Sequence, residues 1–303
     1  PSDYVKVRKL ARFARARKGR RGRGRRRSGG IRIAVRPRGS IMWLTVSGTM
    51  RRGRRRPWTS RRAVYDPGLN LGWAVRRALV KAGVSVEGTV SRARKPRGAR
   101  LVLRKRRSLG RILLAANRHS DNLAAETLVR AMDRAAGGKG GWKQGLARLH
   151  ATLRELDVGR FWLGNGSGLH RGSWVTARTV VTLLQRVHAN AALRRCIVPT
   201  LAVAGKAGTL AGRLRGTDAQ GHLVGKTGTL GGALALSGYA GRRGKRPLVF
   251  SILVNGRASR AVRRHIDRMA LLIARHARGL SLRDEEPRRT DDAGDEPGDS
   301  ADE

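Results

Sequence analysis

Lys226-Thr227-Gly228 is the stretch whose residue types best suit the binding of an anionic peptide end. Lys226 offers a compact cation, Thr227 offers a hydroxyl, and Gly228 has no side chain to keep a substrate backbone away. An extended peptide could also pair with such a strand edge. Alone the motif is weak, because a given tripeptide occurs by chance on the order of 4 times in 100 chains of this length. A lysine and a threonine on a solvated hairpin would explain it better.

Ser120-Asp121-Asn122 is a second candidate, at a break between two stretches of helical periodicity. Serine, aspartate and asparagine are all favoured at helix N-caps, so capping explains the motif as well as catalysis does. The two roles do not exclude each other.

The elements before these motifs indicate a β-rich start followed by one helix. A basic, low-complexity run over residues 7–28 is typical of a solvated loop or arm. Asp66-Pro67, an N-cap acid before proline, predicts a helix that ends at Gly83. The alternation of apolar residues predicts strands over residues 31–35, 41–47, 84–90 and 100–104.

The second half of the chain indicates an α+β fold, in which a helical cluster precedes an antiparallel meander and a covering helix. Residues 161–173 are glycine-rich and loop-like, and Thr176 is placed to cap the helix that follows. Helical periodicity covers residues 111–119, 123–136, 141–156, 177–189 and 259–276. Glycine turns join three strands near residues 222–228, 233–240 and 247–254.

The charge is extreme and uneven. The formal net charge is +47, with 64 Lys and Arg against 10 Asp and Glu up to residue 280. Such a field attracts polyanions without reading sequence, although a genome that favours arginine codons explains it equally well. The last 23 residues reverse the balance, with 10 acids, and their composition predicts disorder.

Other features exclude some classes of protein. Cys196 is the single cysteine, so no internal disulfide or zinc cluster is expected, and the histidines show no metal-ligand spacing. No stretch of 18 apolar residues predicts a membrane-spanning helix, and no apolar segment of a signal peptide opens the chain.

Taken together, the two motifs resemble those of the penicillin-recognising serine acyltransferases, with Lys226 104 positions after Asn122. Four longer stretches sharpen the resemblance: RHSDNLAAETLVRAM, GNGSGLHRGSWVTARTVVTLL, TLAVAGKAGTL and VGKTGTLGGALALSGYA. They are similar to the D-alanyl-D-alanine carboxypeptidase/endopeptidase family of low-molecular-mass class C penicillin-binding proteins, peptidase family S13. The similarity covers residues 60–275 and implies the transpeptidase-like fold.

The resemblance implies catalytic roles for Ser120, Asn122 and Lys226. Ser120 would relay a proton to the departing D-alanine amine, and Asn122 would hydrogen-bond the peptide backbone of the substrate. Lys226 would support the proton network and add positive potential. The implied substrate is a peptidoglycan stem peptide ending in D-Ala-D-Ala, β-lactams would bind the intact enzyme, and no metal or other cofactor is implied.

The same resemblance gives substrate-binding roles to the three residues that follow Lys226. Thr227 would bind the terminal carboxylate. The backbone N–H of Thr229, just past Gly228, would supply half of an oxyanion hole. The implied location is the periplasm or cell envelope.

One motif of the family is missing, and it is the Ser-x-x-Lys motif that carries the acylated serine. None of the 11 lysines has a serine or threonine three residues before it, and the 119 residues before Ser120 are too few for the family's inserted domain. We therefore expect the C-terminal part of a longer enzyme, inactive alone. Residues 1–65 would be a basic arm and the end of the inserted domain, residues 66–280 the acyltransferase part, and residues 281–303 the tail.

The chain departs from the family's pattern in two further ways, in its composition and in one loop. Acidic residues are depleted, and Asn165 stands where the family has aspartate in an Asp-Gly-Ser-Gly stretch. Two other hypotheses therefore stay open beside the peptidase fragment. One is a non-catalytic polyanion-binding protein, and the other is an inactive relative that still binds stem peptides.

Overall fold

The computed structural model shows two compact units, Pro1–Arg104 and Lys105–Glu303, which are described separately. It describes residues 3–14, 30–51, 59–60, 62–93, 98, 100, 102–241, 246–256 and 258–282. The predicted acidic tail from residue 283 onward, and residues 15–28 of the predicted basic arm, lie outside these ranges.

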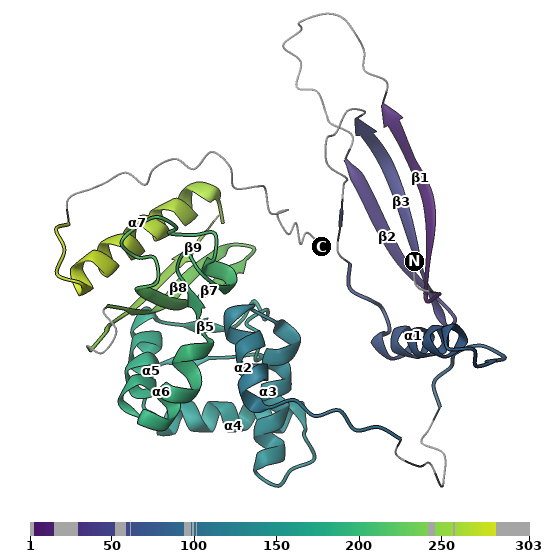
Figure 1. Cartoon of the computed structure of the whole chain (residues 1–303), viewed down its shortest axis with the longest axis horizontal. Helices are drawn as coiled ribbons and strands as arrows, with labels where there is room; N and C mark the ends of the chain where they lie inside the picture. Colours follow the sequence, from purple (N-terminus) through teal and green to yellow (C-terminus); the bar gives the residue numbers. More distant parts are fainter. Residues whose placement is uncertain are drawn as a thin grey trace, which may run out of the picture. The chain divides into compact units, whose positions relative to one another are not determined.

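The N-terminal unit is built on a three-stranded sheet in the order β1-β3-β2 (Figure 1). Its strands are β1 (Val5–Ala14), β2 (Ile31–Arg38) and β3 (Ile41–Arg51). β2 and β3 form the predicted hairpin, and β1 runs parallel to β3. The expectation of a loop was therefore wrong for residues 7–14. Pairing with β3 satisfies the backbone of this basic segment, in which Val5, Val7 and Leu10 are interspersed among charged residues.

The helix α1 (Pro67–Lys81) belongs with this sheet. Asp66 caps it by accepting from Leu69 N at 3.0 Å, as the Asp-Pro pair predicted. The Asp66 N–H donates to the Tyr4 hydroxyl at 2.8 Å, and the Trp73 indole donates to the Ser40 carbonyl at 3.0 Å. These contacts lie within the first compact unit, which extends to Arg104.

The strands predicted over residues 84–90 and 100–104 are absent from the described residues there. Their apolar side chains are not buried, since Val84, Val102 and Leu103 are all exposed. A strand needs a partner for its backbone hydrogen bonds, and no described strand pairs with either stretch. Apolar composition alone therefore gave the wrong prediction.

The C-terminal unit has the predicted α+β architecture. Its helices are α2 (Leu109–Arg118), α3 (Asn122–Ala135), α4 (Trp142–Glu155), α5 (Ala177–Ala189), α6 (Ala191–Ile197) and α7 (Arg260–Ala277). Its strands are β4 (Phe161–Trp162), β5 (Trp174–Val175), β6 (Ala202–Val203), β7 (Leu223–Leu230), β8 (Ala233–Ala240) and β9 (Leu248–Asn255). The sequence did not predict α6, β6 or the short 3₁₀ turns at Val198–Thr200 and Gly208–Leu210.

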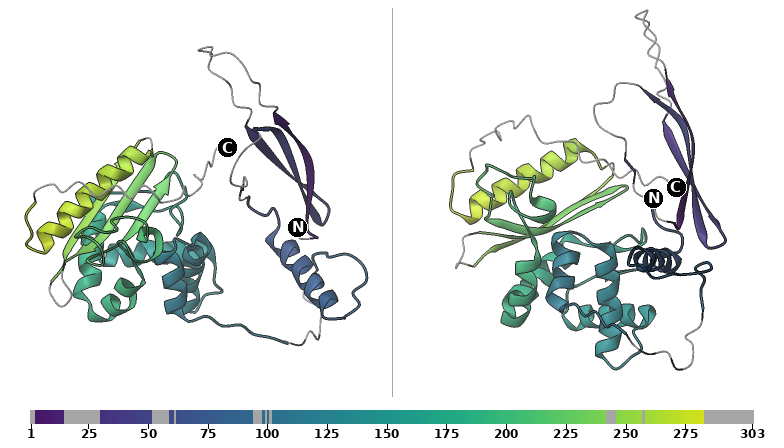
Figure 2. Two further views of the ribbon diagram at one scale, coloured as in Figure 1. Left: turned by 45° about the horizontal axis from the view of Figure 1, so that its top comes forward. Right: turned by 45° about the vertical axis from the view of Figure 1, so that its right-hand side comes forward.

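The main sheet is antiparallel, in the order β6-β7-β8-β9, with α7 on one face and the helical cluster on the other (Figures 1 and 2). Leu223 and Leu236 lie in the core with Ile266 and Ala270 of α7. On the other face of the sheet, the Tyr239 hydroxyl donates a hydrogen bond to the Leu184 carbonyl of α5 at 2.8 Å. None of the described helices combines the length and the apolar character needed to cross a membrane.

Candidate active site

Ser120 lies at the junction of α2 and α3, where the chain turns through a left-handed residue. Its φ is +55°, a conformation that costs free energy for any residue with a Cβ atom. Asp121 is the cap of α3, and its Oδ1 accepts from Ala124 N at 2.9 Å. Asn122 is then the first residue of α3, and it is exposed. Asp121 therefore performs the capping, which leaves the Ser120 hydroxyl for another partner.

That partner is Lys226, on β7. Its ammonium donates to Ser120 Oγ at 2.6 Å and to the Thr227 carbonyl at 2.7 Å. Burial lowers the pKa of the Lys226 ammonium. Two residues 106 positions apart are thus in direct contact. The lowered pKa makes it easier for the lysine to give up a proton near neutral pH.

β7 offers an open edge directly beyond this pair. β8 covers the whole length of one side of β7, but β6 pairs with the other side only at Val224 and Gly225. β7 was predicted to be an edge strand over residues 223–228. β6 pairs with its first part, and the edge from Lys226 to Leu230 has no strand partner among the described residues. The Leu223 carbonyl accepts from Ala204 N at 2.9 Å, so it points to the β6 side. Because peptide groups alternate along a strand, the N–H of Thr229 points to that side as well.

The threonine hydroxyl beside the lysine is oriented by a second threonine. Thr227 Oγ1 donates to Thr209 Oγ1 at 2.8 Å. Thr209 lies in the 3₁₀ turn at Gly208–Leu210. Gly228 is partly buried, and a Cβ atom built on it would lie 3.2 Å from the Ala235 side chain of β8. A larger residue would therefore crowd the sheet next to the open edge.

The glycine-rich loop before β5 is fastened to α3 by Glu126. Its carboxylate accepts from Trp142 Nε1 at 2.8 Å, from Ser167 N at 2.9 Å and from Gly166 N at 3.3 Å. Burial would raise the pKa of Glu126, but the hydrogen bonds outweigh it and hold the pKa below its usual value. Asn165 Oδ1 accepts from Gly168 N at 3.0 Å. An amide oxygen makes this turn as a carboxylate oxygen would, so the asparagine is compatible with the fold of the loop.

Sequence reasoning missed Thr209 and Glu126, although a signal for the first was present. The pattern Gly-Lys-x-Gly-Thr-Leu occurs twice, at residues 205–210 and 225–230. Only the second copy is a strand beside Ser120, and the first supplies Thr209. Glu126 left no comparable signal, because two of its three partners come from a loop about 40 residues away. No cluster of three or more metal-ligating side chains occurs among the residues that the structure describes.

A helical cluster on an antiparallel sheet, with a Ser–Lys pair at the start of an open strand edge, defines the class of penicillin-binding, transpeptidase-like proteins. Solved structures of penicillin binding protein 4 from Haemophilus influenzae share the fold. One, complexed with a novel beta-lactam, has a TM-score of 0.67 and 23% identity over 82% of this chain and 59% of its own. A second structure has a TM-score of 0.64 and 24% identity over 76% of this chain and 51% of its own.

Residues 34–276 match the D-Ala-D-Ala carboxypeptidase 3 (S13) family, and the chain belongs to it. A D-alanyl-D-alanine carboxypeptidase from Actinomadura sp. (strain R39) is 40% identical over 56% of this chain and 32% of its own length. Carboxypeptidase DacB from Mycolicibacterium smegmatis is 33% identical over 51% of this chain and 35% of its own length. The chain thus spans about a third of the length of these curated relatives.

Proposed function

We propose that this chain provides the proton-relay pair and the peptide-binding edge of a serine-type D-Ala-D-Ala carboxypeptidase/endopeptidase that acts on peptidoglycan stem peptides. The observation that carries the proposal is the 2.6 Å contact between Lys226 Nζ and Ser120 Oγ, next to the uncovered half of β7. Membership in the S13 family supports the same reaction class.

Substrate binding would follow from the shape of the edge. An extended stem peptide adds to the open side of β7 as a further strand, with its terminal carboxylate at the Thr227 hydroxyl. The positive charge of Lys226 favours that carboxylate. The N–H of Thr229 would then face the carbonyl oxygen of the bond to be cleaved. Such donors in an oxyanion hole are each worth about 3–4 kcal/mol in the transition state.

Cleavage would proceed through an acyl-enzyme. The nucleophilic serine would give its proton to the lysine of its own motif and attack the carbonyl carbon, the C–N bond to the terminal D-alanine would break, and the departing amine would gain a proton. Water would then hydrolyse the resulting ester and regenerate the serine. Ser120 would pass that proton on, a role supported by the hydrogen bond that Lys226 Nζ donates to its Oγ. The lowered pKa of the buried Lys226 ammonium makes such a transfer less costly.

The acylated serine itself would come from outside these 303 residues. No lysine in the sequence has a serine or threonine three residues before it. The chain also covers only 32% of the Actinomadura enzyme. We accordingly assign residues 1–65 to the end of an inserted domain of the longer enzyme, which would bind β-lactams and act in the periplasm or cell envelope.

The test is release of D-alanine from a peptide ending in D-Ala-D-Ala. The chain is extended with a Ser-x-x-Lys segment, taken from the DNA upstream of Pro1 or, failing that, from the Actinomadura carboxypeptidase. Lys226→Ala should lower kcat/KM by about 10²–10³, the effect of removing one electrostatic or proton-relay group. Lys143→Ala, an exposed lysine on α4, is the matched control and should leave the rate unchanged.

Equal rates for Lys226→Ala and Lys143→Ala would refute the assigned role of Lys226. An extended protein that binds the stem peptide without releasing D-alanine would favour the inactive, peptide-binding relative instead.

A further inference from the structure

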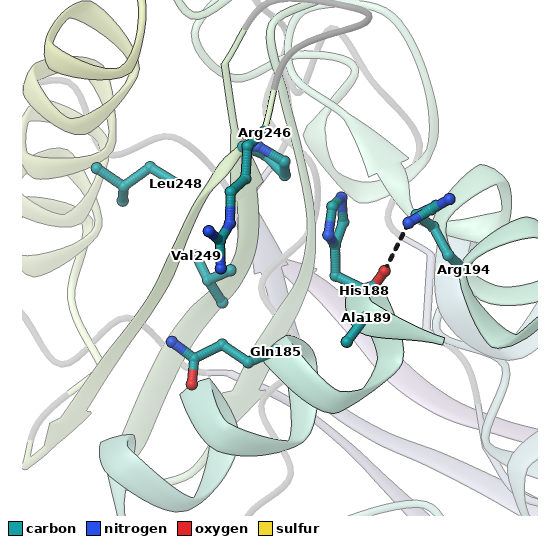
Figure 3. Close-up of a pocket in the computed structure, with 8 residues that line it drawn as sticks. Gln185, His188, Ala189, Arg194, Arg246, Leu248 and Val249 are labelled. Carbon is teal, nitrogen blue, oxygen red and sulfur yellow. Dashed lines mark hydrogen bonds between the residues drawn. The ribbon is translucent and has the colours of Figure 1, made fainter. Parts of the chain in front are cut away.

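The C-terminal unit contains a hollow at the sheet edge opposite to the open side of β7. It lies where α5 ends, α6 begins and β9 begins, and its cavity volume is about 910 Å³ (Figure 3). Gln185, His188, Arg194 and Arg246 form its polar wall, and Leu248 and Val249 contribute apolar surface. We call it the arginine pocket. It contains none of the residues assigned to acyl transfer.

The pocket is positively charged and has no acidic lining residue among those described. Figure 3 shows His188 between Arg194 and Arg246. Arg194 donates one N–H to the His188 carbonyl at 2.8 Å, which fixes one of the five donors of its guanidinium. Arg246 is exposed and forms no hydrogen bond or ion pair with another described residue. Two arginines therefore line one hollow whose described lining contains no acidic residue.

The pKa of His188 is affected by these two arginines. Burial and then the charges of Arg194 and Arg246 lower the pKa of its imidazole. Its ring packs 5.7 Å from the Tyr239 ring, and burial raises the pKa of Tyr239 to about 12, so this phenol stays neutral. The groups that face His188 are thus Arg194 on α6, Arg246 just before β9 and Tyr239 on β8. An anion in the pocket would offset both arginines and allow His188 to become protonated.

We propose that the arginine pocket binds the phosphate group of a phosphorylated ligand. Two guanidinium forks and an imidazolium match the charge and the several acceptor oxygens of a phosphate better than those of a single carboxylate. At about 30 Å³ for each water molecule, the cavity holds far more than one phosphate group. The remainder of the ligand would lie against Leu248 and Val249. It is either a phosphorylated small molecule or the repeating unit of a phosphodiester polymer.

The experiment is calorimetric titration of the 303-residue chain with inorganic pyrophosphate at 0.15 M salt, where non-specific attraction is screened. Arg246→Gln should weaken binding about tenfold or more, the usual effect of losing one charge-assisted hydrogen bond. This variant removes no hydrogen bond to another residue that the structure describes, so it should fold normally. Arg154→Gln, an exposed arginine on α4 with the same loss of charge, should bind as the unchanged chain does.

A second measurement follows His188 by NMR. Pyrophosphate should raise the pKa of its imidazole, and binding should tighten as the pH falls through that pKa. The exposed His222 at the start of β7 is the internal reference and should not respond. Equal weakening by Arg246→Gln and Arg154→Gln, or an unchanged His188 pKa, would overturn the proposal in favour of general charge attraction.

Parallel titrations separate the two sources of phosphate. Glycerol 3-phosphate represents a small monoester, and poly(glycerol phosphate) represents a phosphodiester polymer. The ligand whose affinity falls more in Arg246→Gln shows whether the phosphate belongs to a small molecule or to a polymer. Binding of both that is independent of Arg246 would contradict the phosphate site.

Discussion

Replacing Glu126 by glutamine should destabilise the C-terminal unit far more than its conservative chemistry suggests. The Glu126 carboxylate accepts three N–H donors, from Trp142, Ser167 and Gly166, through its two oxygens. A glutamine keeps one acceptor oxygen and turns an NH₂ group toward the remaining donors. At least one partly buried N–H then loses its partner, which costs about 1–3 kcal/mol.

The assay is urea unfolding of the 303-residue chain, monitored on the C-terminal unit, with the slope m compared between variants. Glu155→Gln is the matched control, because Glu155 is an exposed carboxylate at the end of α4. It should change the free energy of unfolding by less than about 0.5 kcal/mol. If Glu126→Gln stays within that margin, the carboxylate does not hold the glycine-rich loop as the structure implies.

The pH dependence adds a second check of the same contact. The pKa of Glu126 is lowered in the folded chain, so the unfolded chain binds more protons as the pH falls. Its stabilising contribution is fully present above the unfolded pKa of about 4.3 and is lost as the pH falls through the lower folded pKa. The difference in stability between the unchanged chain and Glu126→Gln should therefore shrink in that acid range.

Three other outcomes are expected. Leu236→Ala, at a side chain that is 0% exposed, should cost about 3–5 kcal/mol in unfolding experiments, whereas Leu253→Ala, at 37% exposure, should cost about 1–2 kcal/mol. Similar costs at both positions would contradict the assigned core. Binding of the chain to DNA should weaken about 10³-fold or more between 50 and 200 mM salt, and a flat salt dependence would rule out charge-driven binding. Thr209→Val in the extended enzyme should raise KM severalfold and lower kcat by a smaller factor, because Thr209 orients the Thr227 hydroxyl. Unchanged values of KM and kcat would contradict this role of the contact.

Local chemistry made much of the fold predictable. Asp66-Pro67 and Thr176 marked the starts of α1 and α5, and both side chains cap their helices in the structure. The glycine turns between β7, β8 and β9 gave the antiparallel order. Elements that depend on a distant partner were not predictable in this way. β1 is a strand because β3 pairs with it, while residues 84–90 lack such a partner.

The contact between the candidate residues Ser120 and Lys226 could not be predicted from the sequence. Resemblance to the family singled out Ser120 and Lys226, but nothing in their spacing places them 2.6 Å apart. The left-handed backbone of Ser120 follows from the packing of α2 and α3, since serine has no intrinsic preference for it. The Thr209–Thr227 contact likewise depends on how β6 returns to β7. Each of these features depends on tertiary contacts, which the local sequence does not predict.

The most direct measurement is the intact mass of the 303-residue chain after incubation with excess benzylpenicillin and denaturation. If Ser120 relays protons and the acylated serine lies outside these 303 residues, the mass should not change. The extended protein should gain one penicillin on the serine of Ser-x-x-Lys, because acylation needs an activated hydroxyl placed at the oxyanion hole. A stoichiometric gain by the 303-residue chain, mapped to Ser120 after digestion, would contradict the central claim.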